Sequence, residues 1–89
     1  MARRKRSILR YQEEFTSSLH PHRIMEIERI PLHDGTSYHT DKCRLVTYGI
    51  DPLNRRHVVD IYEAWTPWVA RHIDEVFNLL VTIDLTEKE

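Results

Sequence analysis

Five side chains that could bind a metal ion fall within eleven consecutive positions of this 89-residue chain. They are two histidines, two aspartates and the only cysteine: His33, Asp34, His39, Asp41 and Cys43. Imidazole, carboxylate and thiolate groups together can hold Zn²⁺. The spacing of His33, His39 and Cys43 fits no standard zinc pattern, and a second cysteine is lacking. These three residues are therefore weak metal candidates, and we expect no metal and no cofactor.

Histidine is also the usual general acid or base near neutral pH. The candidates are His33, His39, His57 and His72, and nothing in the sequence places them together. A nucleophilic pair of Cys43 and His39 is disfavoured, because Cys43 begins an expected strand, where a cysteine behaves as a small hydrophobic residue. Glycine-rich phosphate-binding motifs are absent from the sequence. We expect a protein that is not an enzyme, and a histidine-based or metal-dependent nuclease is the alternative left open.

Charge is distributed unevenly along the chain. Five of the 13 Lys and Arg residues lie in the first ten positions, whereas all 14 Asp and Glu residues follow them. A basic segment of this kind indicates contact with a polyanion such as nucleic acid. The predicted nucleic-acid-binding residues are Arg3, Arg4, Lys5, Arg6 and Arg10, with Arg55 and Arg56 of a later turn. The alternative is that the arm, expected to be disordered over residues 1–6, only solubilises the protein.

Three aromatic residues, Tyr62, Trp65 and Trp68, gather where a strand is expected to meet a helix. Such residues are common hot spots of protein interfaces and equally common in cores. We expect one tryptophan to be buried and the other to be exposed beside acidic residues, which would suit a partner protein that carries basic residues. The predicted protein-binding residues are Tyr62, Trp65, Trp68, Asp74 and Glu75.

The first half of the chain predicts a helix followed by strands. Ile8, Tyr11, Phe15 and Leu19 recur at helical spacing, which predicts a helix over residues 7–19 that ends before Pro21. Residues 24–32 alternate and are rich in β-branched side chains, so they predict a strand. A type I′ turn at Asp34-Gly35 and a short partner strand over residues 36–40 follow.

The second half predicts a hairpin and a long helix. Strands are expected over residues 43–50 and 56–64, joined by a turn at residues 51–54 that contains Pro52. Thr66 as N-cap and Pro67 as first helical residue predict a helix. Its apolar face is formed by Val69, Ile73, Val76, Phe77 and Leu80. Residues 81–85 alternate and predict a closing strand, and residues 86–89 are expected to be a frayed tail.

These elements predict a single small α+β domain over residues 7–85. In it, an antiparallel sheet of three to four strands is packed by a long C-terminal helix, with a short helix at the N-terminus. A mass of 10.7 kDa and 40% hydrophobic residues suit one modest core. The sequence has no apolar run of about 20 residues, so we expect no membrane span. The basic start is not followed by an apolar stretch, and Cys43 cannot form an internal disulfide, so we expect a cytoplasmic protein without a secretory signal.

The resulting hypothesis is a small non-enzymatic protein that docks on a larger protein, such as a nucleic-acid-processing enzyme, and regulates or inhibits it. Direct binding of nucleic acid through the basic arm is the alternative. An open strand edge could also pair with a second copy, so a homodimer is left open.

Overall fold

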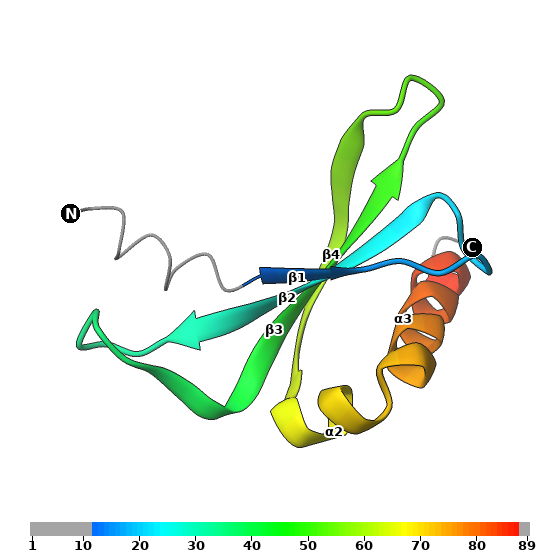
Figure 1. The fold of residues 1–89 in the computed structure, drawn as a ribbon. Coiled ribbons are helices and arrows are strands. Elements are labelled where there is room, and N and C mark those ends of the chain that lie inside the picture. The colour runs from blue at the N-terminus through cyan, green and yellow to red at the C-terminus, as the bar shows by residue number, and fades with distance from the viewer. Residues whose placement is uncertain (1–11, 88–89) are drawn as a thin grey trace.

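The computed structural model of the chain describes residues 12–87. They form a four-stranded antiparallel sheet with helices on one of its faces (Figure 1). The strands are β1 (Gln12–Phe15), β2 (Arg23–Pro31), β3 (Tyr38–Ile50) and β4 (Arg56–Trp65), and they lie in the sheet in chain order. Helices α2 (Thr66–Arg71) and α3 (Ile73–Glu87) follow. The predicted α+β class and the C-terminal helix are confirmed, and the antiparallel sheet, predicted with three to four strands, has four.

The β2–β3 hairpin confirms the strand predicted over residues 24–32 and corrects the turn that follows it. The two strands predicted over residues 36–40 and 43–50 are one strand, β3. Gly35 has the expected positive φ of 76°, but Asp34 does not, so the turn is not of type I′. The Asp34 carboxylate instead accepts hydrogen bonds from the backbone N–H groups of Thr36 and Ser37, at 3.0 and 2.9 Å. These bonds hold the pKa of Asp34 below its usual value.

The β3–β4 hairpin agrees with the prediction and adds an irregularity. In the turn, Asp51 accepts hydrogen bonds from the N–H groups of Leu53 and Arg55, and Asn54 has a φ of 64°. Along the strands, Thr47 pairs with Asp60 but Tyr48 pairs with Val58, so Val59 is an extra residue that forms a β-bulge. The bulge adds one residue to β4. Residues three positions apart, one before the bulge and one after it, therefore lie on the same face of the sheet.

The C-terminal helix differs from the prediction in three ways. It is interrupted at His72, whose φ of −130° and ψ of 41° end α2 before α3 begins. Trp65, not Thr66, is the N-cap, and no side chain caps the helix, although Pro67 lies in its first turn. The strand predicted over residues 81–85 is wrong, because α3 continues through Glu87. Helical spacing extends from Val76 and Leu80 to Asp84, and all three side chains are buried.

The N-terminal part of the described chain is a strand where a helix was predicted. From Gln12 onward the predicted helix is replaced by β1, which pairs with β2 from Gln12 opposite Glu28 to Phe15 opposite Met25. Residues 7–11 of that predicted helix, and the arm at residues 1–6, lie outside the described residues. Pairing with the free edge of β2 outweighs the helical spacing of a few apolar residues.

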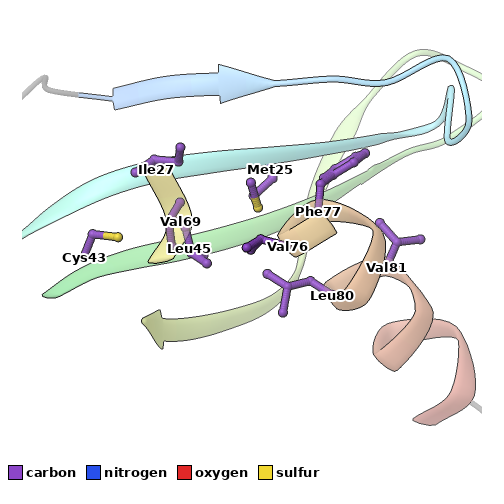
Figure 2. Packing of buried hydrophobic residues seen from close by; sticks show 9 residues of the cluster. All are labelled: Met25, Ile27, Cys43, Leu45, Val69, Val76, Phe77, Leu80 and Val81. Carbon is purple, nitrogen blue, oxygen red and sulfur yellow. The ribbon is translucent and has the colours of Figure 1, made fainter. Parts of the chain in front are cut away.

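The core lies between the sheet and the two helices (Figure 2). The strands supply Met25, Ile27, Cys43 and Leu45, and the helices supply Val69, Val76, Phe77, Leu80 and Val81. Within residues 12–87, neither helix is long and apolar enough to cross a membrane.

Candidate interaction surface

The outer strand β4 exposes large apolar side chains on the face of the sheet that the helices leave uncovered. Val58, Ile61 and Trp65 are 53%, 56% and 60% exposed. Their neighbour Tyr62 points the other way, toward α3. The bulge at Val59 brings Val58 onto the same face as Ile61. This part of β4 is therefore an apolar strip at the border of the sheet.

Both tryptophans are exposed, so the expectation that one of them is buried is wrong. Trp68, in the first turn of α2, is 41% exposed. The neighbouring core position belongs to Val69, which is buried among the strand residues. The Lys42 ammonium group lies 5.9 Å from the centre of the Trp65 ring and 4.0 Å from Glu63 Oε1. The name tryptophan surface is used for the two exposed rings at the junction of β4 and α2, those of Trp65 and Trp68.

Tyr62 does not belong to that surface, because its hydroxyl donates a 2.5 Å hydrogen bond to Asp84 of α3. Asp84 is 2% exposed and also accepts hydrogen bonds from Arg23 at 3.2 Å and from Thr47 at 3.0 Å. These four residues form a buried polar cluster that ties α3 to strands β2, β3 and β4. Its chemistry is that of a structural anchor, since every group in it has a partner.

Two half-buried tyrosines, Tyr48 and Tyr62, predict a loss of stability in alkaline solution. Burial raises the pKa of Tyr62 above its usual value of 10.0, and its hydrogen bond to Asp84 raises it further. Burial and a hydrogen bond to Glu26 likewise raise the pKa of Tyr48 to about 12. A tyrosine with a raised pKa in the folded protein stabilises the fold fully below pH 10, and this contribution is lost as the pH rises through the folded pKa. Urea unfolding between pH 8 and pH 11.5 should therefore show the free energy of unfolding falling above pH 10.

The variant that tests this prediction is Tyr62→Phe. It removes one of the two tyrosines whose pKa is raised in the folded protein. The free energy of unfolding of the variant should therefore fall less steeply above pH 10 than that of the parent. Equal slopes for the two proteins would show that Tyr62 does not carry the effect.

The predicted acidic residues lie in different surroundings from Trp65. Asp74 and Glu75, in the first turn of α3, line a shallow hollow of about 130 Å³ together with Ser17 and Leu19 of the β1–β2 connection. Glu75 Oε1 is 3.1 Å from His72 Nδ1. The structure therefore places the acidic pair beside the β1–β2 connection, whereas Trp65 lies against Lys42 of β3.

The two described arginines of the predicted nucleic-acid surface already have carboxylate partners. Arg55 Nε lies 2.9 Å from Asp51 Oδ2 within the turn. Arg56 reaches across Tyr48 to Glu14 of β1, at 2.7 Å, with its guanidinium 5.3 Å from the centre of the Tyr48 ring. Their positive charge is thus largely matched. The other predicted residues, Arg3, Arg4, Lys5, Arg6 and Arg10, lie outside the described residues.

An open cleft of about 600 Å³ lies beside the β2–β3 hairpin, and sequence reasoning gave no sign of it. Its lining includes Arg29, Tyr38, His39, Cys43 and Thr66. Burial raises the pKa of the Cys43 thiol, and a hydrogen bond with Thr66 lowers it in part, so the thiol is held in its neutral form.

The metal candidates are not brought together. Cys43 is buried in the core, whereas His33 and His39 are exposed. Within residues 12–87, no three His, Cys, Asp or Glu side chains are grouped so that they could hold a metal ion.

Val58 and Ile61 were missed as surface residues, although the sequence carried a signal. In a regularly alternating strand, residue 58 lies on one face and residues 59 and 61 lie on the other, so both faces carry apolar side chains. Since only one face of β4 packs against the core, the other face is apolar and exposed. The bulge that joins the two residues on one face has no such signal. No family model, curated protein or solved structure matches this chain, so the candidate surface rests on its geometry alone.

Proposed function

We propose that this protein is a non-enzymatic binding module that docks on a larger protein and regulates or inhibits it. The observation that carries the proposal is the pair of exposed tryptophans at the junction of β4 and α2. The basic N-terminal residues favour a partner that handles nucleic acid, because such a partner brings a polyanion within reach of the arm.

Exposed tryptophans favour docking for an energetic reason. Tryptophan is enriched among interface hot spots, where it combines a large apolar area with a polar N–H group. Covering the exposed parts of both rings would remove on the order of 200 Å² from water, which is worth roughly 5 kcal/mol before the costs of association. Lys42 and Glu63 place one charge of each sign beside Trp65, which gives the apolar ring a polar border.

Substitution of both tryptophans by alanine tests the proposal. A partner is first isolated by photo-crosslinking from position 42 of the full chain, which lies beside the Trp65 ring, and its affinity is measured by calorimetry. The Trp65→Ala/Trp68→Ala variant should bind at least about 30-fold more weakly, the loss typical of one hot spot. Charge reversal of Asp74 and Glu75 then shows whether the hollow by α3 belongs to the same interface.

The matched control is Leu53→Ala in the β3–β4 turn, because Leu53 is 70% exposed and lies away from both tryptophans. This variant should bind like the parent. Affinity that stays within threefold after loss of both rings, or that falls equally in the control, would overturn docking through the tryptophan surface.

Direct binding of nucleic acid remains the second candidate, and the observation in its favour is the absence of acidic residues among the first twelve positions, which hold five cations. Arg55 and Arg56 support it less than expected, since both are ion-paired. Binding to DNA or RNA that weakens with salt and disappears on removal of residues 1–10 would favour this candidate over protein docking.

A further inference from the structure

The outer edge of β4 is an unoccupied pairing site among the described residues. β4 pairs with β3 on one side, and no described strand pairs with it on the other. The strand is ten residues long, so it presents a row of backbone N–H and C=O groups to solvent, of which the Ile61 N–H is bonded at 2.8 Å by the Asp60 carboxylate and has to be released for pairing. Edges of this length accept another strand readily when the side chains match.

The side chains beside this edge match a copy of themselves. Arg56, Val58, Ile61 and Glu63 lie on the face of β4 that the helices leave uncovered, because the bulge at Val59 shifts the alternation by one. The order along the strand is a cation, an apolar residue, an apolar residue and an anion. A second copy of the strand that runs in the opposite direction places its anion beside the cation of the first copy and its apolar residues beside the apolar centre.

We infer that two copies of this chain pair through their β4 strands in an antiparallel register that places Arg56 opposite Glu63 and Val58 opposite Ile61 of the second copy. The two-fold axis passes between Val59 and Asp60, so each contact occurs twice, as a two-fold interface requires. Opposite charges and apolar pairs that face each other across strands are stabilising. Moving the axis onto Asp60 would place two carboxylates opposite each other, which disfavours that neighbouring register.

Of the two charged residues in this register, Glu63 is exposed, whereas Arg56 has to leave its present partner to make the contact. The Glu63 side chain is 58% exposed and has Lys42 only at 4.0 Å. Arg56 bonds Glu14 of β1 at 2.7 Å by reaching across Tyr48, away from this edge, so the proposed pair exchanges Glu14 for Glu63 of the second copy. The paired sheets would form one continuous eight-stranded sheet that carries a Trp65 and a Trp68 from each copy.

The oligomeric state of the purified full chain tests the inference. Light scattering after size-exclusion chromatography should give twice the monomer mass of 10.7 kDa at high concentration. The Ile61→Lys variant should raise the dimer dissociation constant at least about 30-fold, because two ammonium groups meet apolar residues at the centre of the interface. Leu79→Lys, at an exposed position of α3, is the matched control and should remain dimeric. A parent that is monomeric at 500 µM, or an Ile61→Lys variant that dimerises like it, would overturn the inference.

A disulfide test checks the register without relying on Ile61→Lys. Under mild oxidation, a mixture of the Val58→Cys and Ile61→Cys proteins should form a covalent dimer, because directly opposed residues lie within disulfide distance. Either protein alone should stay unlinked, and Cys43 does not interfere because it is buried. Failure of the mixture to link would refute the register. Both tests use the isolated chain, so their failure would leave docking on a partner protein unaffected.

Discussion

Replacement of Asp84 by alanine is expected to lower the free energy of unfolding by about 3–5 kcal/mol, the usual cost of breaking a buried ion pair by removing one partner. This is a large share of the roughly 5–10 kcal/mol that holds a domain of this size together. Asp84 is 2% exposed and accepts hydrogen bonds from Arg23, Thr47 and Tyr62. Without the carboxylate, the largely buried Arg23 guanidinium loses its counterion and the Tyr62 hydroxyl loses its acceptor, while the Thr47 hydroxyl keeps only the Asp60 carbonyl at 3.4 Å.

Urea unfolding followed by circular dichroism measures this effect. Asp84→Asn keeps an acceptor oxygen but loses the charge, so its cost should fall between zero and that of the alanine variant. Asp74→Ala, an exposed aspartate of the same helix, is the matched control and should cost less than about 1 kcal/mol. A loss below about 1 kcal/mol for Asp84→Ala would show that the cluster is not a structural anchor.

The Asp84 cluster also shows why the end of α3 could not be predicted from the sequence. Residues 81–85 alternate as a strand would, and Asp84 is a polar residue at the buried position of the competing helix. A helical interpretation needs partners for that carboxylate. The partners come from β2, β3 and β4, far away in sequence, so local pattern gave no reason to prefer the helix.

The β3–β4 hairpin could be predicted because its determinants are local. Its strands alternate, and its turn is built by Asp51, Pro52 and Asn54 within a few residues. The strand β1 could not be predicted, since its structure depends on pairing with the edge of β2 rather than on its own residues.

The candidate surface was predicted in part for a similar reason. Trp65 and Trp68 were identified by residue type, but their exposure depends on the tertiary structure, in which Trp65 lies on the uncovered face of the sheet and Val69 takes the core position of α2. Val58 and Ile61 share a face only because of a bulge that sequence pattern does not reveal. Tyr62 was predicted to lie with the tryptophans, but it contacts Asp84, which lies 22 positions further along the chain, and so does not belong to the surface.

Phe77 is the residue through which α3 holds β1 and the connection that follows it. Its side chain is buried, and its ring lies edge-on to Phe15 of β1, at 5.4 Å between centres, and to His20 at 5.6 Å. Among residues 12–87, β1 is four residues long and pairs with β2 alone. Backbone pairing over so short a strand is weak without side-chain packing. The contact of Phe15 with Phe77 is therefore expected to decide whether β1 stays in the sheet.

Phe77→Ala is expected to lower the free energy of unfolding by about 3–5 kcal/mol, because it leaves a cavity at the centre of the core. It should also release β1 before the rest of the sheet, so the amide groups of Glu13–Phe15 should lose their protection from hydrogen exchange more than those of β3. Leu79→Ala, an exposed residue two positions along α3, is the matched control and should leave both measurements near those of the parent. Equal loss of protection in β1 and β3 would mean that the sheet opens as one unit and that Phe77 stabilises the whole core rather than the attachment of β1.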